Sequence, residues 1–203
     1  MTRTRSLEGW PLLGLLSLLL LVMAAVCLAA HSYEVAGVRT VIRATARTSL
    51  VLFALAFGAQ AVLTLWPCAL TRWQRRNRRQ LGLAFAVSHA IHAAAILAFA
   101  RMDPQGFLQH VTTGTLVSGG LAYVVIVAMA LTSFDRTAAW IGPAVWRTLH
   151  WWGGYYLWVS FIVTNGKRIG QSPLYALPVV LMLVLLALRI AARRRTRMLP
   201  RPA

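Results

Sequence analysis

Apolar residues in this chain are gathered into six runs, each about as long as a helix that crosses a lipid bilayer. A transmembrane helix needs about 20 predominantly apolar residues. Polar and charged residues lie mainly in the short connections between the runs. The pattern therefore predicts an all-α integral membrane bundle of six transmembrane helices. The predicted spans are Trp10–Ala30, Ser49–Trp66, Leu81–Ala100, Thr115–Thr132, Val145–Thr164 and Pro173–Ile190.

Composition agrees with this pattern and leaves little chain for anything else. The protein has 203 residues, of which 59% are hydrophobic, so residues 1–203 are expected to form a single transmembrane domain. No glycine-rich nucleotide motif occurs. No Asp, Glu or Lys lies deep in a predicted span, which argues against proton pumps and cation-coupled transporters because these generally need carboxylates inside the membrane.

The strong positive charge is interpreted as a topology signal rather than as a nucleic-acid site. The net charge is +17, with 21 Lys and Arg against 4 Asp and Glu. Placing both termini in the cytoplasm puts most of these cations in the inner connections and tail, as the positive-inside rule requires. The protein is thus predicted to be a multi-pass protein of the cell (cytoplasmic or inner) membrane. The tail "RRRTRMLPRPA" is expected to contact anionic lipid headgroups. Tryptophans at the predicted inner boundary are Trp10, Trp66, Trp73, Trp140 and Trp146.

The first predicted outer connection carries arginines at a helical spacing. Arg39, Arg43 and Arg47 recur at i, i+4 and i+8, which places them on one helical face and predicts that the second helix begins before its apolar run. The first span also has the basic start and small-residue end of a signal peptide. Its long apolar core favours a retained anchor instead. Cys27 and Cys68 are expected at opposite membrane faces, so no disulfide is predicted.

Histidine supplies the candidate chemistry. His89, His92 and His150 lie in the third and fifth predicted spans, where an unpaired polar ring is costly. Each could bridge two helices by a hydrogen bond, or the three could include metal ligands. Three such histidines on two helices that run in the same direction favour metal ligation. His31 and His110 lie outside the spans and are interpreted as exposed surface residues.

The surroundings of these histidines suit a flat cofactor. His89 and His92 are three residues apart, on one helical face. Gly153 and Gly154 follow His150 by about one turn and could admit a macrocycle, or else permit close helix packing. Arg147 could pair with a carboxylate of the cofactor, or extend toward lipid headgroups. Histidine ligation from facing helices is the usual way in which a membrane bundle holds a b-type haem.

Three stretches together resemble a known family. The segment "RRQLGLAFAVSHAIH" opens with a basic pair and Leu-Gly and has a histidine ten residues past the glycine. The segment "ALTSFDRTAAWIGPAVWRTLHWWGGYYLW" ends one helix with Leu-Thr-Ser and begins the next with Trp-x-x-Leu-His. The segment "RTSLVLFALAFGAQAVLTLWP" closes on a proline. They resemble the ferric reductase-like transmembrane domain family, which includes the haem-binding membrane subunit of the methionine sulfoxide reductase system, over residues 43–165. The resemblance implies electron transfer through haem b.

The chain departs from the family at two ligand positions. His92 matches an outer-haem ligand of the family, but the partner position on the fifth helix is Val163. His150 matches an inner-haem ligand, but the position of its third-helix partner is Arg78. A complete ligand pair in the family's register is therefore missing. Two interpretations stay open, namely a divergent site and a member of the family that has lost haem.

The sequence thus predicts an electron-transfer subunit with one b-type haem at most. His150 is the expected first ligand and His89 or His92 the second. At the rise of an α-helix, the predicted depth in the membrane differs from that of His150 by roughly 4 Å for His89 and roughly 8 Å for His92. Two ligands of one iron should lie at similar depths, so depth favours His89. The family's sequence register favours His92. Electrons are expected from a separate flavoprotein reductase or the quinone pool and are passed to an outer-face redox acceptor. The alternative is a non-catalytic membrane scaffold or assembly subunit.

Overall fold

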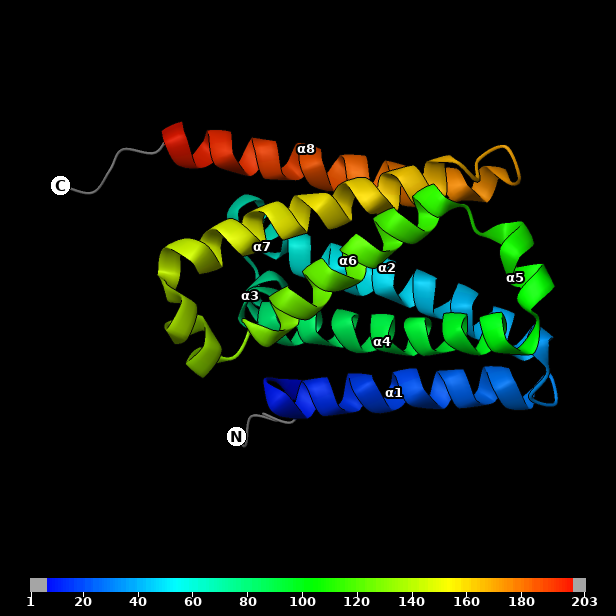
Figure 1. Ribbon diagram of the computed structural model, residues 1–203. Coiled ribbons are helices and arrows are strands. Elements are labelled where there is room, and N and C mark those ends of the chain that lie inside the picture. Colours follow the sequence, from blue (N-terminus) through cyan, green and yellow to red (C-terminus); the bar gives the residue numbers. More distant parts are fainter. Residues whose placement is uncertain (1–6, 199–203) are drawn as a thin grey trace.

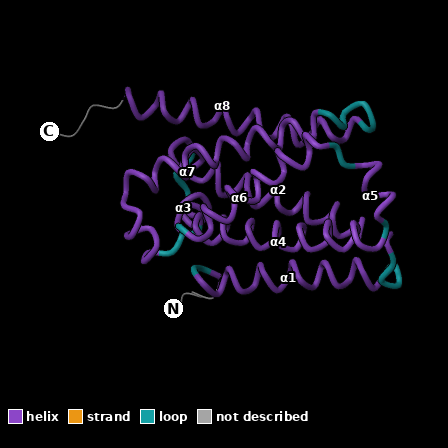
Figure 2. The backbone as a smooth tube through the Cα atoms, viewed as in Figure 1, coloured by secondary structure: helices purple, strands orange, loops and turns teal. Residues whose placement is uncertain are grey.

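The protein is helical throughout the part of the chain that the structure describes. This computed structural model describes residues 7–198 and has no strand in that range; Arg3, Arg5 and the end of the basic tail lie outside it. Figure 1 and Figure 2 show the helices packed along one another. They are α1 (Trp10–Ala29), α2 (Val35–Leu65), α3 (Ala69–Arg76), α4 (Arg78–Met102), α5 (Pro104–His110), α6 (Thr113–Leu131), α7 (Asp135–Gly166), the 3-10 turn η2 (Pro173–Tyr175) and α8 (Ala176–Met198).

Five segments are long and apolar enough to cross a membrane. They are α1, α2, α4, α6 and the segment from η2 through α8, and they coincide with five of the six predicted spans. The remaining predicted span, Val145–Thr164, is helical within α7 but is not among the five. Tryptophan, tyrosine, glycine and histidine lower its hydropathy, so composition alone does not mark it as a span.

The long helices alternate in direction along the chain (Figure 1). The beginning of α1 and the end of α8 therefore lie at the same end of the bundle, which we call the terminal end. The start of α2, the end of α4 and helix α5 lie at the opposite end, which we call the distal end. Helix α2 begins at Val35, well before its apolar run, as the spacing of Arg39, Arg43 and Arg47 predicted.

A seam of small hydroxyl side chains joins α2 to α4. Thr45, Ser49 and Ser88 are fully buried, each with 0% exposed surface. Ser49 Oγ donates to Ser88 Oγ at 2.8 Å, and Ser88 Oγ donates to the Thr45 carbonyl at 3.2 Å. Small polar residues let two helix backbones approach closely and bond to each other where no water is available. The seam fixes which face of α4 turns toward α2.

Aromatic side chains fill the space where α2, α4 and α7 meet. Phe53 of α2 lies within 5.1–5.6 Å, between ring centroids, of Phe57, Phe85 and Phe161. Leu81, Ile126 and Leu157 belong to the same buried cluster. Because offset and edge-on aromatic pairs add to the stabilisation from burial, this cluster holds the three helices around the candidate site.

Helix α7 bends sharply near its beginning. Gly142 has φ +76° and ψ 160°, and Pro143 follows it. A positive φ favours glycine, and proline suits the first turn of a new helix. Residues 135–141 thus form a short arm at the terminal end, and residues 143–166 form a long helix that packs on α6 and α8. The bend brings His150 and Trp146 against the end of α6.

Candidate cofactor cavity

A cavity of about 360 Å³ lies in the terminal half of the bundle. Its walls come from α2, α4, α6, α7 and α8, with arginines of α3 at its edge. The volume is in the range of small-molecule and cofactor sites. Phe53, Phe57, Phe85 and Leu157 give it an apolar side, and His150, Thr132 and Ser133 give it a polar side.

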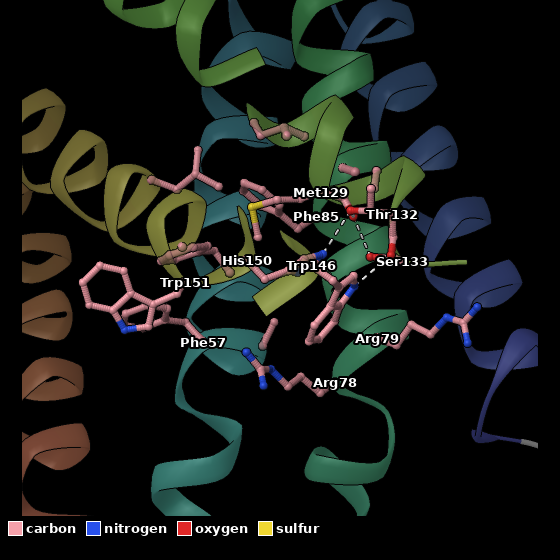
Figure 3. A pocket seen from close by; sticks show the side chains of 18 of the residues that line it. Phe57, Arg78, Arg79, Phe85, Met129, Thr132, Ser133, Trp146, His150 and Trp151 are labelled. Atoms are coloured by element: carbon pink, nitrogen blue, oxygen red, sulfur yellow. Dashed lines mark hydrogen bonds between the residues drawn. The ribbon is translucent and has the colours of Figure 1, made fainter. Parts of the chain in front are cut away.

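His150 lies in the wall of this cavity and is held in one orientation (Figure 3). Its ring stacks on that of Trp146, with centroids 4.4 Å apart, and its Nε2 lies 3.2 Å from Thr132 Oγ1. The Trp146 indole N–H donates to the Thr132 carbonyl at 2.9 Å. Thr132 Oγ1 donates to the Ala128 carbonyl at 2.7 Å, so it is free to accept from the histidine.

His89 lies in aromatic surroundings and has no hydrogen-bond partner on another helix within the described residues. Its Nδ1 is buried and has no hydrogen bond within the described residues. The ring centroid is 4.5 Å from that of Phe85 and 5.9 Å from that of Tyr123. A buried ring nitrogen without a partner is unusual, because its desolvation is then uncompensated. His89 is therefore the one of the three histidines for which the structure offers no helix-bridging bond.

A smaller cavity, with His89 in its wall, adjoins the cavity of His150. It has a volume of about 150 Å³ and lies between α4 and α6, with His89 and Tyr123 in its wall. Ala86, Ile126 and Ala130 line both cavities. The two histidines thus face adjoining spaces from α4 and α7, separated by small or aliphatic side chains.

His92 is turned toward α2. Its Nδ1 lies 2.9 Å from Thr45 Oγ1 of α2, next to the hydroxyl seam, and Thr45 Oγ1 donates to the Val41 carbonyl. His92 lines neither of the two cavities. Although the ring centroids of His89 and His92 are only 5.7 Å apart, the structure gives His92 a bonded position between two helices.

The other predicted site residues divide between the cavity and the surroundings. Gly154 lines the cavity, and a Cβ built on it would meet Phe57 at 3.6 Å. Gly153 faces α6, where a Cβ would lie 2.5 Å from Met129 Sδ, so its role is close helix packing. Arg147 is exposed and does not line the cavity.

Arginines at the cavity mouth were not predicted as site residues. Arg76 pairs with Glu8 at 2.7 Å and Arg79 pairs with Asp135 at 3.0 Å. No carboxylate within residues 7–198 pairs with the three remaining arginines that line the cavity, which are Arg75, Arg78 and Arg189. In Figure 3 Arg78 lies below His150 and Trp146, while Arg79 is directed away from them. The mouth therefore carries uncompensated positive charge and favours an anionic group.

Arg189 could have been found from the sequence. It falls inside the last predicted span, and an arginine within a span is a signal of a functional or structural site. In the structure its guanidinium lies 4.0 Å from the Phe57 ring centroid, and its Nη1 donates to the Phe57 carbonyl at 2.6 Å. Its Nε is buried without a partner within the described residues.

The predicted ligands His89 and His150 lie in the walls of two adjoining cavities. His89 has an unpartnered buried nitrogen, His150 lines the adjoining cavity, and Arg78 and Arg189 could hold carboxylates of the cofactor. Residues 7–198 contain no group of three or more His, Cys, Asp or Glu that could hold a bare metal ion. A haem needs only two axial ligands from the protein.

Comparison of the chain with protein-family models, with curated proteins and with solved structures finds no match. The resemblance to the ferric reductase-like family therefore stays a prediction from the motifs quoted above.

Proposed function

We propose that the protein passes electrons across the cell membrane through one b-type haem held by His89 of α4 and His150 of α7. The observation that carries the proposal is the buried, unpartnered Nδ1 of His89 in a cavity that shares Ala86, Ile126 and Ala130 with the cavity of His150. Predicted depth and observed surroundings both favour His89 over His92 as the second ligand.

The chain's own residues would bind and shield the cofactor. Trp146 orients the His150 ring, Phe57 and Phe85 exclude water from the apolar side, and Arg78 and Arg189 neutralise carboxylates at the mouth. Gly154 leaves room beside Phe57. A bound b-type haem would supply one-electron redox chemistry.

Electrons would enter from a partner, because the chain shows no recognisable nucleotide-binding motif. A separate flavoprotein reductase or the quinone pool would deliver them at the terminal end, and a redox acceptor would take them on the outer face. The exposed arginines near the end of α8 would contact anionic lipid at the inner face. The protein would thus be an electron-transfer subunit.

The proposed topology has six spans, with α7 as the fifth and both termini in the cytoplasm. In its support, α7 packs on two apolar helices, α6 and α8, and its long part runs between the two ends of the bundle (Figure 2). Six crossings return the chain to the face at which it started. The terminal end also carries most of the arginines, in agreement with the positive-inside rule.

Reporter fusions would test this topology. Fusions after Arg136 and after Met198 are expected to report the cytoplasm, and fusions after Gln105 and after Gly170 the outer side. A fusion after Met198 that reports the outer side would contradict the arrangement with six spans.

Electron transfer can be measured in sealed vesicles that contain the purified protein, with ferricyanide enclosed as an impermeant acceptor. Reduced flavin mononucleotide added outside is expected to reduce the ferricyanide faster than in protein-free vesicles. His150→Ala should return the rate to that of protein-free vesicles, and NADH or NADPH alone should give no reduction. A wild-type rate equal to that of protein-free vesicles would contradict the proposed function.

A non-catalytic scaffold is the second candidate, and two hydrogen bonds favour it. His92 is bonded to Thr45 and His150 to Thr132, so both rings already join helices. Ligation through Nε2 of His150 would require the bond to Thr132 to break. On this interpretation the purified protein is colourless even from cells with ample haem.

A further inference from the structure

Three arginines form an exposed stripe on the distal half of α2. Arg39, Arg43 and Arg47 follow one another at one-turn spacing, and all three are exposed. Arg39 lies over the ring of Phe99 at 5.6 Å, and Arg43 Nη2 donates to Thr40 Oγ1 at 3.0 Å. None of the three forms an ion pair within residues 7–198.

The packing of α2 places this arginine stripe beside apolar parts of its neighbours. Thr45 contacts His92 and Ser49 contacts Ser88 of α4, so Arg47 is level with the middle of the apolar helix α4. Arg47 lies twelve residues into α2, roughly 18 Å from its beginning at the rise of an α-helix. Arg47 is therefore farther from the distal end of α2 than one arginine side chain extends.

The same face of α2 is covered in the terminal half of the bundle. Gly58 lies three turns beyond Arg47 on that face, and a Cβ built on it would meet Leu185 of α8 at 2.8 Å. Figure 1 and Figure 2 show that α8 and α2 diverge toward the distal end. The arginine stripe therefore begins where the cover by α8 ends.

No Asp or Glu of residues 7–198 pairs with the arginine stripe. The protein has four acidic residues. Glu8 and Asp135 are paired at the terminal end, and Asp103 caps α5 by accepting from the Gly106 N–H. Glu34 immediately precedes α2, so every carboxylate lies near one end of the bundle. Arginines within the membrane are costly unless they are paired or hydrated.

We propose that the arginine stripe binds a membrane-spanning helix of another protein, one that carries two carboxylates four residues apart near the middle of its span. Such spacing would place one carboxylate opposite Arg43 and the other opposite Arg47. Arginine–carboxylate pairs are strong, directional bonds, and their attraction is stronger away from bulk water. This contact would form whether or not the protein binds haem.

A designed pair of peptides tests this proposal. Both are membrane-spanning Leu-Ala helices that differ only at two mid-span positions four residues apart, which are Glu in the probe and Gln in its control. Association with the protein is measured by energy transfer in phosphatidylcholine vesicles. The Glu peptide is expected to associate about tenfold more tightly than the Gln peptide, and the protein with Arg43→Gln and Arg47→Gln should lose this preference.

Two further variants of the protein serve as controls. The double variant Arg43→Lys, Arg47→Lys keeps both positive charges and should keep the preference for the Glu peptide. It allows the preference to be measured if the glutamine variant does not fold. Arg101→Gln removes another exposed distal arginine and should change nothing. Equal association of the Glu and Gln peptides would overturn the proposal. Loss of the preference on adding phosphatidylglycerol would overturn it too, because lipid phosphates would then satisfy the arginines.

Discussion

His150→Ala and His89→Ala are each expected to abolish the spectrum of a six-coordinate b-type haem, and His92→Ala to leave it in place. His150 and His89 face adjoining cavities from α7 and α4, whereas His92 is bonded to Thr45 of α2. Loss of either histidine would leave a haem with one protein ligand, which would change its spectrum or release it. Haem retained per folded protein, together with the reduced spectrum, measures the effect.

Stability separates the role of His92 from that of the ligands. His92→Ala breaks the contact with Thr45 and should lower the free energy of unfolding in mixed micelles by about 1 kcal/mol, with haem content unchanged. His110→Ala is the control, because His110 is exposed at the distal end. If His150→Ala keeps a normal spectrum, its ring is only a polar bridge to Thr132.

Gly154→Leu is expected to yield a folded protein that takes up little haem. Gly154 lines the cavity beside Phe57, so a leucine side chain would project into the space that the cofactor needs. Gly154→Ala should keep its haem, because the added Cβ would be in ordinary contact with Phe57 at 3.6 Å. Haem per folded protein in the series Gly, Ala, Leu would measure how closely the cofactor approaches α7.

Gly153 gives a matched control for this series. A Cβ at Gly153 would lie 2.5 Å from Met129 Sδ and 3.0 Å from Val125 Cγ1 of α6. Gly153→Leu should therefore lower stability by about 1–3 kcal/mol through overpacking, whether or not haem is bound. A Gly154→Leu protein with a full complement of haem would show that the cofactor does not occupy this cavity.

Much of the helical architecture follows from hydrophobic pattern alone. Apolar runs of span length predicted five apolar helices of the structure, and the arginine spacing predicted the early start of α2. The short helices α3 and α5 and the bend at Gly142–Pro143 were not predicted, because they depend on tertiary contacts and on local backbone geometry. The fifth predicted span is helical, but its aromatic and polar residues give it a weaker signal than its neighbours.

The candidate site was only partly predictable. The spacing of His89 and His92 indicated one helical face, but it could not show that α2 would bond one ring while the other faced α6 and α7. Likewise Arg78 and Arg75 could not be told from arginines that only set topology, because sequence does not show which of them border a cavity. Gly153 and Gly154 allowed two interpretations, close helix packing or room for a cofactor. In the structure Gly153 packs against α6, whereas Gly154 lines the cavity.

The most direct test of the central claim is the reduced-minus-oxidised spectrum of the wild-type protein, purified in detergent from cells with ample haem. A haem between α4 and α7 requires one b-type haem per chain that dithionite reduces. This haem should be absent from the double variant His89→Ala, His150→Ala. Colourless wild-type protein, folded and with no haem band, would contradict it.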